Sequence, residues 1–190
     1  MNSIRLAIYN MILRPIPSAR FSGVRVWWLR KCGVVIGKNC EIQENVRIKG
    51  GGSLVLGDDV TLRSGAFIEC GNSIKIGNRV EINYGTILAA NCQSEIIVED
   101  DVHIAHLCSL KGSTHEISSN GKSVAGKCVF KNITIGEGSW LCAGAIVLPD
   151  VTIGKRNIVA AGAVVLHSTD DNVLMAGVPA VPKKIYGDVE

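Results

Sequence analysis

The sequence contains few aromatic residues and few prolines. Aromatic side chains make up only 5% of the 190 residues, although the hydrophobic fraction is 47%. A core built from this composition is mainly aliphatic, which suits a narrow stack of strands better than a wide globular interior. Five prolines against 21 glycines indicate turns that depend on residues with positive φ.

The sequence also lacks paired cysteine motifs and long apolar runs. None of the seven cysteines forms a C-x-x-C pair, and we expect Cys40, Cys92 and Cys108 to pack as small hydrophobic residues. The apolar stretch at residues 6–13 is short and interrupted by Asn10, so it predicts neither a signal peptide nor a membrane span. We therefore expect a reduced, cytoplasmic protein.

The dominant pattern in the chain is a repeat of six residues marked by aliphatic side chains. Hexapeptide periods are typical of a parallel β-helix, in which three hexapeptides complete one triangular coil. The repeated positions are Ile36, Ile42, Ile48, Leu56, Leu62, Ile68, Ile76, Ile82, Leu88, Val98, Ile104, Leu110, Ile135, Leu141, Val147, Ile153, Val159 and Val165.

The repeat divides the chain into three regions. Residues 1–32 precede it, residues 33–167 form the predicted β-helix domain, and residues 168–190 form a closing segment and tail. Within the domain the repeat is interrupted by a polar segment, predicted as an inserted loop at residues 111–133. Long loops inside a tight repeat usually carry function.

Residues 1–32 are predicted as a basic helical arm. Ile4, Ile8, Met11 and Ile12 have helical spacing, and Pro15 ends the helix. All the charged residues that precede Glu41, the first acidic residue, are basic. Two tryptophans, Trp27 and Trp28, lie among them. We expect this arm to contact an anionic membrane; a partner subunit or solvent is the alternative, and no nucleic-acid partner is expected.

Four segments of the chain carry a family resemblance. Residues 82–87 (INYGTI), 110–116 (LKGSTHE), 133–140 (ITIGEGSW) and 176–180 (AGVPA) resemble the hexapeptide-repeat acyltransferases. The similarity is greatest to the galactoside and maltose O-acetyltransferases and to the sugar O-acetyltransferases of surface-polysaccharide synthesis. The resemblance implies an all-β, left-handed parallel β-helix that forms a homotrimer with active sites between subunits.

The same resemblance implies an activity. The protein would transfer an acetyl group from acetyl-CoA, with no metal, to a sugar hydroxyl in capsule, O-antigen or exopolysaccharide synthesis. The basic arm would hold this cytoplasmic protein close to the surface of the inner membrane. N-acetylation of an amino sugar and acetylation of serine remain alternatives.

His115 is the predicted general base. Histidine suits proton transfer near neutral pH, His115 lies where the repeat breaks, and it matches the catalytic histidine of the family. The alternative is an ordinary exposed loop histidine. The resemblance also assigns acceptor binding to Asn83 and Tyr84, and it assigns acetyl-CoA binding to Trp140, Ala143, Ala161, Gly162 and Lys183.

Two other classes of function remain open from the sequence. His103, His106 and Cys108 could hold zinc, as in carbonic-anhydrase-like hexapeptide proteins, although their spacing does not reproduce that of the metalloenzyme. A scaffold without catalysis is the second alternative. Nucleophilic cysteine chemistry is disfavoured, because most cysteines occupy positions of the repeat.

Overall fold

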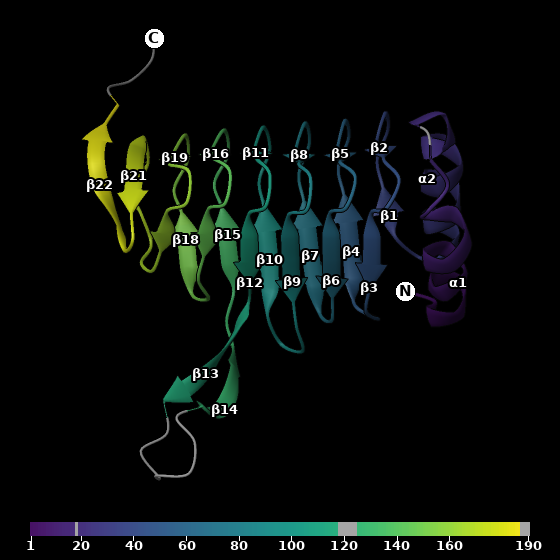
Figure 1. The fold of residues 1–190 in the computed structure, drawn as a ribbon, viewed down its shortest axis with the longest axis horizontal. Coiled ribbons are helices and arrows are strands. Elements are labelled where there is room, and N and C mark those ends of the chain that lie inside the picture. The colour runs from purple at the N-terminus through teal and green to yellow at the C-terminus, as the bar shows by residue number, and fades with distance from the viewer. Residues whose placement is uncertain (18, 118–124, 187–190) are drawn as a thin grey trace.

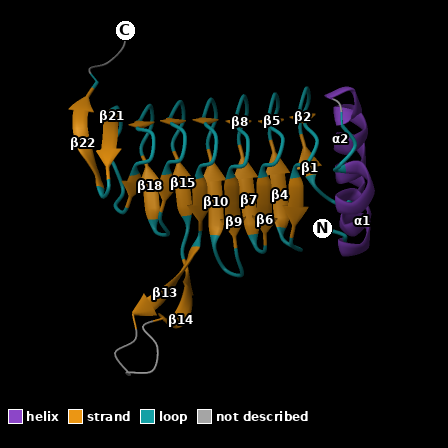
Figure 2. Ribbon diagram, viewed as in Figure 1, coloured by secondary structure: helices purple, strands orange, loops and turns teal. Residues whose placement is uncertain are grey.

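The computed structural model describes residues 1–17, 19–117 and 125–186. The described chain forms a three-sided prism of short parallel strands, with helices across one end and a strand pair at the other (Figure 1). A two-stranded hairpin projects from the side of the prism. Figure 2 shows that helix is confined to the end near the N-terminus. The predicted parallel β-helix is confirmed.

Three sheets, here named A, B and C, form the sides of the prism. Sheet A contains β1 (Val35–Ile36), β4 (Ser53–Leu56), β7 (Ser73–Ile76), β10 (Glu95–Val98), β15 (Ile133–Ile135) and β18 (Val151–Ile153). Sheet B contains β2 (Glu41–Ile42), β5 (Thr61–Leu62), β8 (Glu81–Ile82), β11 (His103–Ile104), β16 (Trp140–Leu141), β19 (Ile158–Val159), β21 (Val173–Gly177) and β22 (Ala180–Ile185). Sheet C contains β3 (Arg47–Lys49), β6 (Phe67–Cys70), β9 (Ile87–Ala90), β12 (Ser109–Lys111), β17 (Ile146–Val147) and β20 (Val164–Val165).

The chain visits the sheets in the order A, B, C, and each circuit is one coil. We number the coils by residue range: coil 1 (35–52), coil 2 (53–72), coil 3 (73–94), coil 4 (95–132), coil 5 (133–150) and coil 6 (151–172). The parallel register places Ile82 beside both Leu62 and Ile104. Each aliphatic anchor of the repeat therefore stacks on the anchors of neighbouring coils.

These stacked anchors are the core of the protein. All the aliphatic positions that define the repeat are buried, and Ile42, Leu62, Ile82 and Ile104 have no exposed surface. Replacing one such residue by alanine is expected to cost about 2–5 kcal/mol, because the stack leaves little room to collapse around a cavity. The repeat therefore supplies the shape of the prism and a large part of its buried apolar core.

The N-terminal helices close the first coil. The chain forms α1 (Ser3–Ile8), continues as the π-helix η1 (Tyr9–Leu13), and then forms η2 (Ala19–Phe21) and α2 (Ser22–Lys31). Leu6, Tyr9 and Leu29 pack against the core of the prism. The predicted helix before Pro15 is confirmed, and the later helix α2 is an addition that the sequence analysis did not foresee.

Side chains of these helices satisfy the backbone groups at the open edge of coil 1. Tyr9 Oη donates to the Val46 carbonyl at 3.0 Å, and Ser22 Oγ accepts from the Ile42 amide at 2.8 Å. Asn10 Nδ2 donates to the Ile48 carbonyl at 2.7 Å. Arg25 is fully buried and donates to the Ile42 carbonyl at 3.1 Å. Burial also raises the pKa of the Tyr9 phenol above its usual range.

The apolar stripe of the first helix faces away from the prism. Ile4 is 74% exposed, Met11 is 77% exposed and Ile12 is 56% exposed. The face that docks on the prism carries Leu6 and Tyr9 instead. Among the helices that the structure describes, none is both long and apolar enough to span a membrane.

The interruption of the repeat contains two strands. β13 (Ser113–Ile117) pairs antiparallel with β14 (Ala125–Phe130), and the resulting hairpin leaves the prism between sheets C and A (Figure 1). Residues 118–124, the middle of the predicted loop, lie outside the described residues. The strands were hidden in the sequence because the segment is polar and has lost the six-residue repeat.

Candidate active site

One corner of the prism collects most of the residues predicted to bind ligands. Between sheets B and C, each coil makes a short turn, and we call this line of turns the B–C corner. Asn83 and Tyr84 occupy it in coil 3, Ala143 occupies it in coil 5, and Ala161 and Gly162 occupy it in coil 6. The six-residue repeat thus aligns residues that are up to 79 positions apart in the sequence.

The geometry of this corner is set by one residue per turn with positive φ. Gly85, Gly144 and Gly162 have φ values of 66°, 72° and 67°, and Leu107 has a φ of 59°. This left-handed conformation favours glycine. In coils 4 to 6, the backbone amide of this residue donates a hydrogen bond to a backbone carbonyl in the turn of the preceding coil. Leu107 donates to the Tyr84 carbonyl at 2.9 Å, Gly144 to the His106 carbonyl at 2.8 Å and Gly162 to the Ala143 carbonyl at 2.9 Å.

In coils 3 and 4 the corner is polar and aromatic; we call residues 83–84 and 105–107 the polar stretch. The rings of Tyr84 and His106 stack with centroids 5.2 Å apart and planes at 14°. Tyr84 is 45% exposed, whereas Asn83 is only 6% exposed. Leu107 completes the stretch with a side chain that is 71% exposed. The predicted acceptor residues therefore lie together, beside a flat aromatic surface.

Asn83 is also tied to the adjoining face of sheet B. Its Nδ2 lies 3.3 Å from His103 Nε2 and 3.2 Å from the Ile104 carbonyl oxygen. His103 Nδ1 lies 3.1 Å from Glu81 Oε2. Arg63 Nε donates to Glu81 Oε1 at 2.6 Å. An unbroken chain of polar contacts thus leads from Arg63 to Asn83, which is predicted to bind the sugar acceptor.

In coils 5 and 6 the corner carries only small side chains; we call residues 142–144 and 160–162 the smooth stretch. Ala143, Ala161 and Gly162 are exposed, so a ligand could lie directly against the backbone here. Trp140 stands on sheet B just before this stretch and is 46% exposed. Trp140 is in register with His103 of β11, and β11 lies next to β8. The predicted cofactor residues therefore begin two strands away from the strand that leads into Asn83 and Tyr84.

Lys183 lies at the end of the prism, beyond the smooth stretch. It belongs to β22, which pairs antiparallel with β21. The register shifts at this point, since Leu174 faces Lys184 while Met175 faces Pro182. Lys183 is exposed, and the structure places it on the same sheet as Trp140, several strands away.

His115 lies at a different corner of the prism. It sits within β13, opposite Cys128 of β14, and its side chain is exposed. The imidazole Nδ1 lies 3.1 Å from the Gly126 carbonyl oxygen. A carbonyl oxygen can only accept, so Nδ1 carries a hydrogen, and in the neutral imidazole Nε2 then has the lone pair. The hairpin thus presents an imidazole whose free nitrogen is a proton acceptor.

Within one chain the structure does not bring His115 to the B–C corner. The hairpin leaves from the corner between sheets C and A, whereas Asn83, Ala143 and Ala161 line the corner between sheets B and C. The residues that the sequence analysis grouped into one site are therefore divided between two edges of the prism.

The three residues considered for zinc do not converge. His103 bonds to Glu81 on the face of sheet B, His106 stacks on Tyr84, and Cys108 is buried and donates to the Cys142 carbonyl at 3.2 Å. Over the described ranges, no group of three or more His, Cys, Asp or Glu side chains is placed to hold a metal ion.

The buried thiols are poorly suited to nucleophilic chemistry. Burial raises the pKa of Cys108 to about 11 and also raises the pKa of Cys142, whereas a nucleophilic cysteine needs a lowered pKa. Cys108 packs as predicted, and Cys40 is half-buried. Cys92, however, is exposed in a turn with a φ of 48°, so its predicted packing is wrong.

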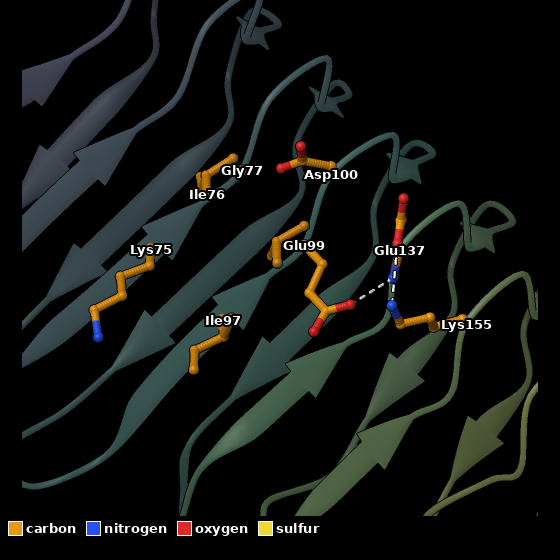
Figure 3. Close-up of a pocket in the computed structure, with 9 residues that line it drawn as sticks. Lys75, Ile76, Gly77, Ile97, Glu99, Asp100, Glu137 and Lys155 are labelled. Atoms are coloured by element: carbon orange, nitrogen blue, oxygen red, sulfur yellow. Dashed lines mark hydrogen bonds and ion pairs between the residues drawn. The ribbon is translucent and has the colours of Figure 1, made fainter.

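A separate hollow lies on sheet A and its corner with sheet B (Figure 3). Its charged side chains are engaged: Lys155 Nζ lies 3.1 Å from Glu137 Oε2, Glu99 Oε2 accepts from the Glu137 amide at 2.9 Å, and Lys75 Nζ lies 2.8 Å from Glu95 Oε1. Its lining includes none of the predicted site residues. We assign these contacts to holding successive coils in register.

Comparison with known proteins agrees with this architecture. Residues 132–167 match the family described as bacterial transferase hexapeptide (six repeats). These residues carry the bacterial transferase hexapeptide repeat. No curated protein matches the hexapeptide-repeat chain in sequence.

The hexapeptide-repeat chain is similar to several solved structures. A mutant of AntD, an N-acyltransferase from Bacillus cereus, in complex with dTDP and coenzyme A, is 22% identical with a TM-score of 0.73, covering 84% of this chain and 88% of that one. Another AntD mutant, 21% identical with a TM-score of 0.73 and the same coverage, was solved with dTDP-4-amino-4,6-dideoxyglucose and coenzyme A.

A third similar structure is the hexapeptide-repeat-containing acetyltransferase VCA0836 from Vibrio cholerae, complexed with acetyl coenzyme A. It is 21% identical with a TM-score of 0.70, and the match covers 97% of this chain and 85% of that chain. At these identities the likeness establishes the fold.

Glu81 and Arg63 were not among the residues predicted for this site, and His103 was predicted only as a candidate zinc ligand. A usable signal was present. Glu81 and His103 each directly precede an anchor of the repeat, Ile82 and Ile104, so the repeat places them side by side on the outer face of sheet B. Asn83 follows Ile82 directly and reaches the same group.

Proposed function

We propose that the protein is an acetyltransferase that moves the acetyl group of acetyl-CoA to a sugar hydroxyl, with His115 as general base. The observation that carries the proposal is the Nδ1 contact of His115 with the Gly126 carbonyl oxygen at 3.1 Å. It leaves Nε2 ready to take the proton of the attacking hydroxyl. The hydroxyl oxygen then attacks the thioester carbon, and CoA leaves as the thiol.

We propose that the smooth stretch holds the acyl donor. Ala143, Ala161 and Gly162 are exposed and carry small or no side chains, so an extended pantetheine arm could lie close against the backbone along this line. Trp140 offers a flat surface beside that line, and Lys183 offers a cation for a phosphate. Coenzyme A or acetyl coenzyme A in the similar structures supports this choice of donor.

The acceptor is proposed to be a hydroxyl-bearing sugar of surface-polysaccharide synthesis, held by Asn83 and Tyr84. Aromatic rings such as Tyr84 suit the apolar face of a sugar ring. A second candidate is N-acetylation of an amino sugar. It is favoured by the AntD complex with a dTDP-amino sugar, and the same base and the same donor stretch would serve it.

We propose a homotrimer in which each site lies between two subunits. The support is the division of the site residues between two corners: His115 of one chain would serve the B–C corner of a neighbour. Sedimentation velocity provides the direct check, with three chains of 20.2 kDa in one particle as the expected result. A monomer that retains full activity would contradict the proposal.

The decisive experiment is an acceptor screen that measures release of free CoA. His115→Ala is expected to lower the turnover of the responsive acceptor about 100- to 10,000-fold, the usual contribution of a general base. The control is His167→Ala, because His167 is also exposed and is not one of the residues assigned to the site. Unchanged turnover in His115→Ala, or equal losses in the two variants, would overturn the proposal.

We also propose that the helical arm attaches the protein to the cytoplasmic face of an anionic membrane. Its exposed stripe carries Ile4, Met11 and Ile12, and α2 adds Trp27, which is 55% exposed. The first 40 residues contain basic but no acidic side chains. Apolar side chains flanked by cations are typical of helices that lie in a membrane interface.

Sedimentation with vesicles rich in phosphatidylserine tests this attachment. Met11→Asp and Trp27→Asp are expected to reduce the bound fraction strongly, and Leu107→Asp, at an equally exposed apolar residue away from the arm, should leave it unchanged. Point variants are needed because the arm also closes coil 1. Equal binding by all three variants would assign the arm to another partner.

A further inference from the structure

A chain of four polar side chains crosses sheet B and ends at the B–C corner. Arg63 Nε donates to Glu81 Oε1 at 2.6 Å, and His103 Nδ1 lies 3.1 Å from Glu81 Oε2. His103 Nε2 in turn lies 3.3 Å from Asn83 Nδ2. The first three residues are partly exposed, whereas Asn83 is 6% exposed. The chain therefore leads from the surface to a buried carboxamide.

The hydrogen positions in this chain follow from the chemistry of its members. A carboxylate only accepts, and Glu81 already accepts from Arg63, so His103 Nδ1 must donate to it. In the neutral imidazole, Nε2 then has a lone pair and accepts from the Asn83 amide nitrogen. The Glu81 carboxylate thus determines which nitrogen of His103 faces Asn83.

The carboxamide of Asn83 is oriented by two acceptors. Its Nδ2 faces both His103 Nε2 and the Ile104 carbonyl oxygen, at 3.3 and 3.2 Å. Rotating the carboxamide by half a turn would place Oδ1 next to these two acceptors, and neither of them could donate a hydrogen bond to it. In the described parts of the chain Oδ1 has no hydrogen-bond partner, and it is not sealed from solvent. Asn83 therefore presents an unused acceptor oxygen at the B–C corner, next to Tyr84.

We propose that Glu81 and His103 are positioning residues that hold the Asn83 oxygen outward, so that the acceptor site selects a ligand group that donates a hydrogen bond. This inference rests on the proposed function and deepens it. The selected group is a sugar hydroxyl or an amine; a carboxylate or a fully ionised phosphate has no hydrogen to donate. If His103 lost its Nε2 lone pair, the carboxamide would be free to turn its NH2 group to the ligand.

A double-mutant cycle on the acceptor KM tests whether His103 acts through Asn83. Asn83→Ala and His103→Phe are each expected to raise the acceptor KM about tenfold, the size of one hydrogen bond to a ligand. The double variant should be no worse than Asn83→Ala alone. KM for acetyl-CoA should change less than the acceptor KM in all three variants. Glu81→Gln, which can still accept from Nδ1, should retain more acceptor affinity than Glu81→Ala.

His167→Phe is the matched control, since it makes the same replacement at an exposed histidine outside the network. The inference is overturned if the effects of His103→Phe and Asn83→Ala multiply, because His103 would then act independently of Asn83. It is also overturned if Glu81→Ala and Glu81→Gln are equivalent, or if KM for acetyl-CoA rises as much as the acceptor KM.

A second measurement is independent of activity. Nitrogen chemical shifts of the His103 ring, in protein labelled at histidine, should report hydrogen on Nδ1, and Glu81→Ala should move them toward a tautomer mixture. Hydrogen on Nε2, together with intact His115-dependent CoA release, would overturn the network alone. The expected Nδ1 tautomer with no CoA release from any acceptor would instead overturn the proposed function, and with it the selection assigned to Asn83.

Discussion

The polar stretch and the smooth stretch occupy the same corner of the same prism, yet they offer a ligand opposite surfaces. Both repeat one turn whose third residue has positive φ and whose amide bonds to the previous coil. In coils 3 and 4 the turn displays Asn83, Tyr84 and His106. In coils 5 and 6 it displays alanine and glycine.

The difference shows how a repeat can build two binding surfaces on one backbone. The anchors of the repeat face inward and define the prism, so the corner residues are free to vary between coils. In our proposal, the large or polar side chains on one length of the corner recognise the shape and the hydrogen-bond donors of the acceptor. Small side chains on the next length expose the backbone itself. Trp140 and His103, in register on adjacent strands, mark the boundary.

The largest expected effect comes from filling the smooth stretch. Ala161→Trp should raise KM for acetyl-CoA by about tenfold or more, equivalent to about 1.4 kcal/mol or more of lost binding, because the new ring would cover the accessible backbone. The same replacement at Ser64, which occupies the equivalent turn position in coil 2, should leave that KM unchanged. Initial rates at varied acetyl-CoA measure both.

Hybrid oligomers extend this test to the division of the site between chains. Mixing His115→Ala subunits with Ala161→Trp subunits should restore part of the activity, because an intact hairpin from one chain can then meet an intact smooth stretch from another. Mixtures that are no more active than the separate variants would place both parts of the site in a single chain.

A smaller effect is expected in the polar stretch. Tyr84→Ala should raise the acceptor KM about 2- to 10-fold, as expected for loss of about 0.5–1.5 kcal/mol of aromatic contact, while Tyr84→Phe should retain most of the affinity. Tyr186→Ala, a tyrosine at the far end of the prism, serves as the control. An effect of Tyr84→Ala on KM for acetyl-CoA alone would reverse our assignment of the two stretches.

The last comparison concerns the stability of the two stretches rather than their binding. Gly85→Ala and Gly162→Ala should each cost about 1–2 kcal/mol, because alanine is disfavoured at positive φ. Gly85→Ala should cost more, since its Cβ would lie 2.8 Å from Leu107 Cδ2, whereas at Gly162 the space is open. Adding Leu107→Ala to Gly85→Ala should remove the excess. Urea denaturation measures all three variants, and equal costs for the two glycines would contradict the steric argument.

The sequence predicted the fold better than it predicted the site. The anchors of the repeat are buried as expected, because a six-residue period has few structural solutions. The stripe formed by Ile4, Met11 and Ile12 was compatible with packing inward, but the helix docks through Leu6 and Tyr9 instead. The Tyr9 hydroxyl donates a hydrogen bond to the Val46 carbonyl of coil 1, whereas an isoleucine side chain has no hydrogen-bond donor.

The site was harder to predict because it depends on which residues of neighbouring coils lie side by side. The proximity of Glu81 and His103 follows from register between coils, and the extra residues in coils 3 and 4 obscure that register in the sequence. The hairpin that carries His115 gave no repeat signal at all. Its separation from the B–C corner becomes visible only when the chain is wound into a prism.

The N-terminal helices also cap the prism at the end formed by coil 1. A bare first coil would offer open strand edges to another copy, and stacking end to end would extend the prism into a fibre. Because Tyr9, Ser22 and Arg25 engage those backbone groups, growth is blocked at that end whatever the number of coils behind it. The length of the prism can therefore change by whole coils without creating a self-adhesive end.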